Sequence, residues 1–522
     1  MTEAQGLTRR ALLVGVGAAG GAGAMFAAMG ALGLAPGEET PKPRFEPPQR
    51  SDFRLTGRAA AKVIVLGAGV AGLTCAYELG KAGYDCTVLE ARDRIGGRSL
   101  TLRGGDTVTD ASGETQRAGF GDGVYFNAGP GRIAQWMVTM DYCRELGVPI
   151  ETFVNNNASA YVYNQGMAAP VRARTARADL YGYIAELLAK ATDTGALNRR
   201  LDRDDRERLV EFLRRFGDLG ERLDYEGSPR RGYTVNPGLT EGTALPSPGS
   251  LADVLAGGIG RSVTMDFGYD QATPMFQPVG GMDGIVAALA RQVGADHIKT
   301  GMAVTKITDL PHGVEVVCGQ TVFKADYCVA ALPPNVLAGI PGNLGADVTA
   351  ALRVPRPVSA GKIGLEYGRR WWELDDRIYG GVTETDLDIT HIWYPSHGYH
   401  SARGLVVGYY ATDENAVAYA GLPHRERLAR ALAQGEKIHG RKYREELLSS
   451  VSIAWERQPH IGGGWVRWPS FTGGFELLRR PAGRVYFAGD WLTHLIAWQA
   501  GAMESARAVV THLHRRVLSA PS

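Results

Sequence analysis

The fold of this chain is decided by residues 62–90, KVIVLGAGVAGLTCAYELGKAGYDCTVLE. The continuous apolar run over 63–66 is typical of a strand that is buried on both faces of a parallel sheet. Gly67, Gly69 and Gly72 follow in the spacing GxGxxG. These glycines permit a tight turn, let a pyrophosphate approach the backbone, and allow the next helix to pack against the strand. The stretch therefore predicts the start of a Rossmann-type α/β domain.

The residues after the glycines complete a dinucleotide-binding unit. A helix expected over 71–82 offers phosphates its dipole and the N–H groups of its first turn, beginning at Ala71. A second strand over 86–89 ends at Glu90, whose carboxylate is placed to hydrogen-bond ribose hydroxyls and would repel a 2′-phosphate. Strand, loop, helix, strand and acidic residue occur in this order, so the segment predicts a bound dinucleotide.

The extension over 89–98, LEARDRIGGR, resembles the FAD-binding fingerprint of the flavin amine oxidase superfamily, which includes monoamine, polyamine and L-amino acid oxidases. The resemblance runs from about 62 to 514. It implies that Arg98 lies near the pyrophosphate and flavin, that the Val304 backbone meets the adenine, and that Asp490 binds the ribityl or phosphate region. The FAD site implied consists of Gly67, Gly69, Ala71, Gly72, Glu90, Ala91, Arg92, Gly97, Arg98, Gly129, Gly131, Arg132, Val304, Gly489, Asp490, Trp498 and Gln499.

The cysteines bear on how the flavin is attached. Monoamine oxidases bind it covalently through a cysteine in an SGGCY segment, and the comparable stretch 459–465, PHIGGGW, has none. The resemblance therefore implies noncovalent FAD. The chain has five scattered cysteines, without a CxxC pair or metal-ligand spacing, which favours buried free thiols and predicts no metal site.

Arg132 is the candidate substrate anchor. It lies in YFNAGPGRI, 125–133, which resembles an element of L-amino acid oxidases whose arginine binds the substrate α-carboxylate in a bidentate pair. A structural ion pair or a pyrophosphate contact are the alternatives. The resemblance also makes Tyr409 a donor to the same carboxylate. Tyr410 would point to the opposite face of the strand, so a one-residue register error would exchange the two roles.

Other residues complete the expected active site. The lysine matching Lys362 holds a water near the flavin and assists reoxidation by oxygen in the family. Trp465, Ala497 and Trp498 are expected to line the substrate pocket, with Trp371 and Trp372 as weaker candidates. No histidine occurs before residue 290, so a histidine base from the helical region is not expected.

Composition and the N-terminal sequence indicate which partners and which cellular location to expect. A net charge of +2 with 21% charged residues gives no support to nucleic-acid binding. Arg9 and Arg10 precede a glycine-rich apolar run, which predicts a twin-arginine export signal rather than a stable membrane anchor, and hence a periplasmic or extracellular protein. An N-terminal anchor is the alternative. Relatives are commonly dimers, so a homodimer is a further expectation.

The expected architecture is a Rossmann-type FAD-binding domain, a mixed-sheet α+β substrate domain and a helical insertion. The resemblance implies oxidation of L-amino acids, with apolar or aromatic side chains, to 2-keto acids, ammonia and hydrogen peroxide. An amine or polyamine oxidase and a tryptophan 2-monooxygenase-like flavoenzyme are the alternatives. The segments expected are a signal peptide (1–36), a linker (37–58), the FAD-binding domain (59–103, 275–340 and 450–515), the substrate domain (104–164 and 341–449) and the helical domain (165–274).

Overall fold

The structure, a computed structural model, describes residues 61–519 except 263, 265 and 266. The expected signal peptide and linker lie outside these residues, so export stays a prediction. Within the described part, no helix has the length and apolar character needed to cross a bilayer.

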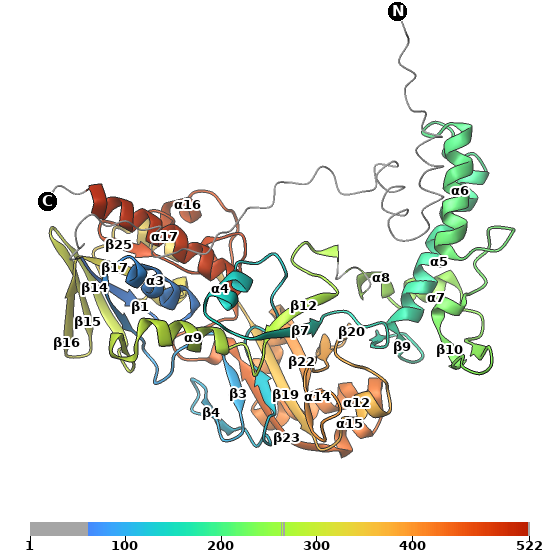
Figure 1. The fold of residues 1–522 in the computed structure, drawn as a ribbon, viewed down its shortest axis with the longest axis horizontal. Helices are drawn as coiled ribbons and strands as arrows, with labels where there is room; N and C mark the ends of the chain where they lie inside the picture. The colour runs from blue at the N-terminus through green and yellow to red at the C-terminus, as the bar shows by residue number, and fades with distance from the viewer. Residues whose placement is uncertain (1–60, 263, 265–266, 520–522) are drawn as a thin grey trace, which may run out of the picture. The chain divides into compact units, whose positions relative to one another are not determined.

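A five-stranded parallel sheet carries the glycine-rich turn. Its strand order is β13-β2-β1-β17-β25, and every neighbouring pair is parallel. The predicted parallel α/β sheet, assembled from separate parts of the chain, is confirmed (Figure 1). Its strands are β1 Lys62–Leu66, β2 Asp85–Leu89, β13 Ile298–Lys299, β17 Tyr327–Ala330 and β25 Val485–Phe487.

Side chains of β1 alternate between two packed layers, which explains its unbroken apolar run. Val65 packs against the turn of helix at Gly72, whereas Ile64 and Leu66 join an apolar cluster that includes Val316 of a three-stranded antiparallel sheet. A strand covered on both faces has no polar side to present to water. The layers are α3 Val70–Lys81, α9 Gly284–Val293 and α17 Gln499–Ser519 on one side, and β14 Val304–Leu310, β15 Gly313–Cys318 and β16 Thr321–Ala325 on the other.

A second sheet has seven strands in the order β23-β19-β22-β21-β20-β8-β9. Only β20 and β8 pair in parallel, which confirms the predicted mixed sheet. The predicted domain boundary at residue 450 is wrong, because it cuts through β23, which pairs with β19 along its length. The strands are β8 Tyr161–Tyr163, β9 Val171–Arg172, β19 Ala360–Tyr367, β20 Val382–Thr385, β21 His391–Trp393, β22 Gly404–Thr412 and β23 Leu447–Ala454.

The two faces of this sheet have different roles. One face, with Ile363 and Leu365, packs into an apolar core against four helices. The other face carries Lys362 and borders the cavity described below. The covering helices are α12 Trp371–Leu374, α13 Asp413–Ala420, α14 His424–His439 and α15 Lys442–Glu445.

Short paired strands join the sheets and bring the end of the helical insertion beside the predicted anchor. Ile133 and Phe276 exchange two backbone hydrogen bonds of 2.7 and 2.9 Å, so residues 269–274 lie next to Arg132. The pairs are β3 Thr101–Arg103 with β6 Tyr125–Asn127, β4 Thr107–Thr109 with β5 Thr115–Arg117, β7 Ile150–Val154 with β12 Pro274–Pro278, and β18 Arg356–Val358 with β24 Trp465–Arg467. The short helices are α4 Thr139–Glu145, α10 Pro334–Leu337, α11 Ala346–Leu352 and α16 Gly474–Leu478.

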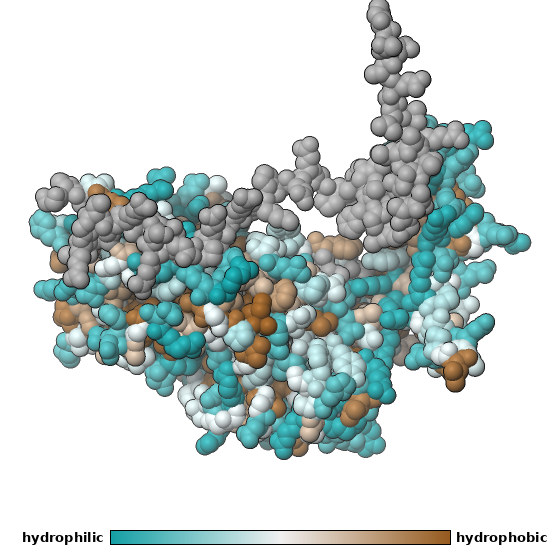
Figure 2. Space-filling view, in the orientation of Figure 1, coloured by the Kyte–Doolittle hydropathy of each residue, from teal (hydrophilic) through white to brown (hydrophobic). Residues whose placement is uncertain are grey.

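Helices dominate the insertion, as the apolar spacing predicts. Asp202 caps α6 by accepting a hydrogen bond from Asp205 N at 2.8 Å. The surface over α6 is hydrophilic (Figure 2), which fits its charged sequence. The elements are α5 Ala173–Asp193, α6 Arg203–Gly217, α7 Leu251–Ala256, α8 Ile259–Ser262 and the hairpin β10 Tyr233–Val235 with β11 Thr243–Ala244.

Candidate active site

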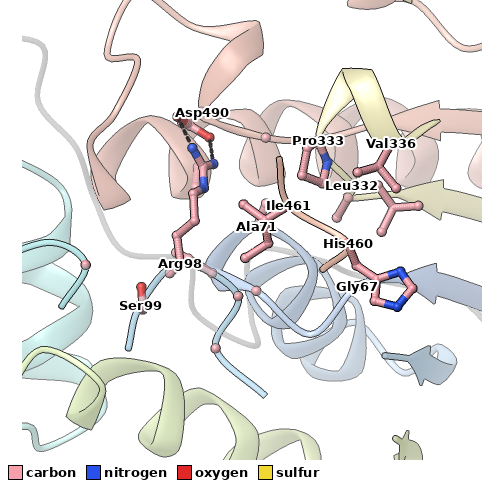
Figure 3. Close-up of a pocket in the computed structure, with 18 of the residues that line it drawn as sticks. Gly67, Ala71, Arg98, Ser99, Leu332, Pro333, Val336, His460, Ile461 and Asp490 are labelled. Atoms are coloured by element: carbon pink, nitrogen blue, oxygen red, sulfur yellow. Dashed lines mark hydrogen bonds and ion pairs between the residues drawn. The ribbon is translucent and has the colours of Figure 1, made fainter. Parts of the chain in front are cut away.

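A cavity of about 230 Å³ runs from the carboxyl ends of the parallel strands to the second sheet. Ligands bind at this edge in open α/β sheets. The cavity brings together residues more than 400 positions apart in the sequence (Figure 3). The predicted site residues that line it are Gly67, Gly69, Ala71, Glu90, Ala91, Arg92, Gly97, Arg98, Gly129, Val304, Lys362, Trp465, Gly489, Asp490, Ala497, Trp498 and Gln499.

Two glycines allow backbone segments to touch where no side chain would fit. A Cβ on Gly72 would lie 1.9 Å from the Gly67 carbonyl oxygen. A Cβ on Gly129 would lie 1.9 Å from the Arg98 carbonyl oxygen. Gly72 therefore acts from behind the cavity wall, by letting α3 approach β1, whereas Gly129 also lines the cavity.

Glu90 lies at the end of the cavity beside the glycine-rich turn. The residue is buried, and its carboxylate accepts hydrogen bonds from Ala68 N at 2.9 Å and from Arg92 N at 3.1 Å. The carboxylate thus connects the glycine-rich turn (67–72) to the start of the fingerprint loop, the FAD-binding stretch over 89–98. The Arg92 Nη1 atom is buried without a hydrogen-bond partner among the described residues.

Arg98 and Asp490 form an ion pair across the middle of the cavity wall (Figure 3). Arg98 Nη1 also donates to the Gly464 carbonyl at 2.6 Å. Asp490 Oδ2 accepts a hydrogen bond from Ala497 N at 2.9 Å, where Ala497 has a left-handed φ of 71°. The pair therefore connects three separate segments, and it places the residues before α17 on the cavity wall.

Lys362 lies at the opposite end of the cavity, where the second sheet borders it, and its side chain is buried. Its Nζ donates to the carbonyls of Gly129 at 2.5 Å and Asn127 at 3.3 Å, and lies 4.8 Å from the ring centres of Trp393 and Tyr410. Burial, together with the charge of Arg132, lowers the pKa of Lys362 to about 7. The ammonium is therefore poised to gain or lose its charge near neutral pH.

The prediction that Tyr409 faces the substrate is wrong, and Tyr410 takes that place. Tyr409 is fully buried on the other face of the sheet, stacked on Tyr419 at 4.3 Å between ring centres. Tyr410 pairs directly with Lys362 across the two strands and lines the cavity.

A β-bulge is the physical reason. Ile363 pairs with Tyr409 while Gly364 pairs with Val407, so Gly408 is an extra, unpaired residue. An extra residue reverses the alternation of side chains beyond it. Regular alternation from Val407 would have brought Tyr409 to the cavity face.

Arg132 lies directly behind the part of the cavity wall that Lys362 and Tyr410 form. Its guanidinium stacks on the Trp393 ring at 4.7 Å and donates from Nη2 to Gln271 Oε1 at 3.1 Å. Among the described residues it forms no ion pair with a carboxylate, and its Nε is buried without a hydrogen-bond partner. Burial lowers the pKa of Arg132, and the nearby Tyr410 has its pKa raised by burial. A structural ion pair, one alternative for this arginine, is absent from the described part of the chain.

The turn over 269–271 completes the surroundings of Arg132, and sequence reasoning missed it. Trp498 Nε1 donates to Asp270 Oδ2 at 3.0 Å, and Trp136 Nε1 donates to the Tyr269 carbonyl at 3.1 Å. The turn lies at the end of a long insertion, where no local motif distinguishes it. Only its tertiary contacts show that it belongs to the site.

Other residues differ from expectation. Trp371 and Trp372 are fully buried in the core under the second sheet, so the prediction that they wall the pocket is wrong. Gly131 lines a smaller neighbouring cavity that also contacts Lys362. The segment 331–340 lines the main cavity and was missed, although it directly follows the apolar strand β17, and ligands bind at the carboxyl ends of such strands. All five cysteines are free and buried, as predicted.

Comparison with known proteins identifies the family. Residues 70–514 match the flavin containing amine oxidoreductases. The chain belongs to this family. It is therefore a flavin-dependent oxidoreductase.

Relatives in the flavin amine oxidoreductase family cover most of the chain. The flavin-dependent L-tryptophan oxidase of Lentzea aerocolonigenes is 28% identical over 491 residues, covering 87% of this chain and 98% of the relative. The L-amino-acid oxidase of Bothrops pauloensis is 26% identical over 473 residues, covering 87% and 89%. A solved structure, the cyclohexylamine oxidase from Brevibacterium oxydans IH-35A, shares the fold with a TM-score of 0.59 and 17% identity, covering 88% of this chain and 99% of that chain.

Proposed function

We propose that this chain is an FAD-dependent L-amino-acid oxidase that converts L-amino acids to 2-keto acids, ammonia and hydrogen peroxide. The observation that carries the proposal is Arg132, a buried arginine beside the cavity that forms no hydrogen bond or ion pair with a carboxylate among the described residues, although Asp270 and Glu384 lie near enough to act on its charge. Leaving a buried cation unpaired is costly, which favours an anionic ligand as the missing partner. The two oxidases of L-amino acids among the relatives support the same substrate class.

Arg132 and Tyr410 together suit a carboxylate. The guanidinium offers planar, paired donors, and Tyr410, whose hydroxyl can donate a further hydrogen bond, lines the cavity and interacts electrostatically with Arg132. Both groups lie next to Lys362, which lines the cavity. A substrate carboxylate held here would set the rest of the amino acid toward the cavity and fix its orientation.

The residues of the cavity fit FAD. The glycine-rich turn and the N-terminus of α3 would hold the pyrophosphate, and Glu90 would hold the ribose. Two polar atoms of lining residues, Arg92 Nη1 and Gln499 Oε1, are buried without a partner among the described residues and suit polar groups of the cofactor. No cysteine lines the cavity, which supports noncovalent binding. FAD held here would supply the redox chemistry, a hydride acceptor for the substrate Cα and a donor of electrons to oxygen.

Lys362 and the tryptophans have separate tasks in this proposal. The protonated ammonium of Lys362, held by two backbone carbonyls, stabilises negative charge that develops on oxygen during reoxidation. Trp465 and Trp498 line the cavity and exclude water from the reacting end, and they favour an apolar or aromatic substrate side chain. The indole of Trp498 is fixed by its hydrogen bond to Asp270.

An amine or polyamine oxidase is the second candidate, since solved structures of that fold are amine oxidases. Its substrates carry no carboxylate and would leave Arg132 without a partner. A tryptophan 2-monooxygenase-like reaction would release an amide instead of a keto acid. The mass of the product separates these reactions.

The test combines a substrate screen with one variant. Peroxide is measured with L- and D-amino acids, polyamines and simple amines, and flavin bleaching is followed without oxygen. Arg132→Met should lower kcat/KM for L-amino acids about 100-fold or more, because two charge-assisted hydrogen bonds are removed, while the flavin stays bound. Arg144→Met, at a side chain that is 76% exposed on α4, is the matched control. Oxidation of amines with no turnover of any L-amino acid would overturn the proposal, and loss of flavin from Arg132→Met would favour a pyrophosphate contact.

A further inference from the structure

The side-chain amide of Gln271 holds the Arg132 guanidinium in place. Its Oε1 accepts hydrogen bonds from Arg132 Nη2 at 3.1 Å and from Asn155 Nδ2 at 3.2 Å. An arginine can only donate, so the atom that faces it must be the amide oxygen rather than the NH₂ group. The orientation of the Gln271 amide is therefore determined by Arg132.

Gln271 is itself anchored from two directions. Asn155 is fully buried, and its backbone N–H donates to the Thr273 carbonyl at 2.9 Å. On the cavity side, Trp498 binds the neighbouring Asp270, and Gln271 N donates to the Gly268 carbonyl at 2.9 Å to close the turn. These contacts give the amide a fixed position from which it can orient the guanidinium.

The chemical nature of this acceptor matters as much as its position. A carboxylate in the same place would form an ion pair with Arg132 and neutralise it. An amide oxygen accepts the hydrogen bond but carries no net charge, so it adds nothing to the partial compensation that the carboxylates of Asp270 and Glu384 provide without direct contact. The buried Arg132 Nε, which has no partner among the described residues, leaves another donor unused.

We infer that Gln271 is a positioning residue that orients Arg132 and, by remaining neutral, keeps the charge of Arg132 available for the substrate carboxylate. This role rests on the proposed function, because it concerns the same carboxylate. It assigns part of substrate recognition to the turn over 269–271, at the end of the helical insertion. Gln271 acts through Arg132 and takes no part in the redox chemistry.

The test is Gln271→Glu in the flavin-loaded enzyme. Glutamate has nearly the same size as glutamine and satisfies both donors, so folding and flavin content should stay unchanged. Its charge should pair with Arg132 and compete with the substrate. We expect the KM for the best L-amino acid substrate and the Kd for benzoate, a simple carboxylate probe followed by the flavin absorbance spectrum, to rise at least tenfold, with kcat changed less than about threefold.

Two further variants separate charge from shape. Gln271→Met removes the acceptor without adding charge, and should raise the benzoate Kd less than Gln271→Glu does. Gln292→Glu adds the same charge at an exposed position of α9 and should leave both constants unchanged. If Gln271→Glu binds benzoate within twofold of the unsubstituted enzyme, the inference is overturned while the proposed function stands. If the unsubstituted enzyme neither binds benzoate nor oxidises any L-amino acid, both are overturned.

Discussion

The adjacent tyrosines of β22 allow a direct test of how the substrate is held. Tyr410 lines the cavity beside Lys362 and Arg132, whereas Tyr409 is fully buried on the opposite face. Tyr410→Phe and Tyr409→Phe each remove a single hydroxyl from neighbouring residues of one strand. Because the same substitution is made at both positions, each variant is the control for the other.

The expected magnitudes follow from the surroundings of each hydroxyl. A hydrogen bond to a charged carboxylate contributes about 1.5–3 kcal/mol, so Tyr410→Phe should lower kcat/KM for L-amino acids about 10- to 100-fold. The Tyr409 hydroxyl is buried without a hydrogen-bond partner among the described residues. Its removal leaves no group newly unpaired, and Tyr409→Phe should change kcat/KM less than about twofold and the free energy of unfolding by less than about 1 kcal/mol.

Initial-rate kinetics with several L-amino acids, together with thermal unfolding of the flavin-loaded proteins, measures both quantities. A larger loss of kcat/KM for Tyr409→Phe than for Tyr410→Phe would refute the bulge argument, because it would return Tyr409 to the substrate face. Equal losses in the two variants would refute the assignment of the carboxylate to one side of the strand.

Two further predictions concern the cation and the backbone contacts of the cavity. Lys362 is charged below its pKa of about 7 and neutral above it, so the rate constant for reoxidation by oxygen should fall as the pH rises through 7. Lys362→Met should slow reoxidation about 10- to 100-fold and abolish that dependence in stopped-flow measurements, while anaerobic flavin reduction persists; an unchanged pH profile in the variant would contradict this. Gly129→Ala would place a Cβ 1.9 Å from the Arg98 carbonyl oxygen, and should yield protein with little bound flavin by absorbance. Gly80→Ala, where a Cβ meets nothing within 4 Å, should keep its flavin, and equal flavin content in both variants would show that the close approach is not required.

Much of the cofactor site could be predicted from the sequence because its determinants are local. The glycine spacing, the apolar run over 63–66 and the position of Glu90 all express constraints between residues close in the chain. The same applies to the fingerprint loop, and 17 predicted residues meet in one cavity. The ends of the first two strands were predicted within one residue, since burial on both faces leaves a clear apolar pattern.

The substrate end was predicted less completely because its geometry depends on pairing between distant strands. A bulge at Gly408 arises from the register of β22 against β19, and it decides which tyrosine faces the cavity. Trp371 and Trp372 have the same aromatic character as the lining tryptophans, but the packing of α12 buries them elsewhere. Residue type alone does not distinguish these environments.

By itself, the sequence determined the dinucleotide-binding unit, the flavin family and the identity of the arginine that lies beside the cavity. The tertiary structure decided which partners that arginine has: Gln271 from the end of the insertion, Trp393 and Tyr410 from the second sheet, and no carboxylate in hydrogen-bond or ion-pair contact among the described residues. The physical reason is the separation along the sequence over which each constraint acts. Glycine spacing and strand burial act over a few residues, whereas the hydrogen-bond partners of a buried guanidinium are set by segments that meet only when the chain folds.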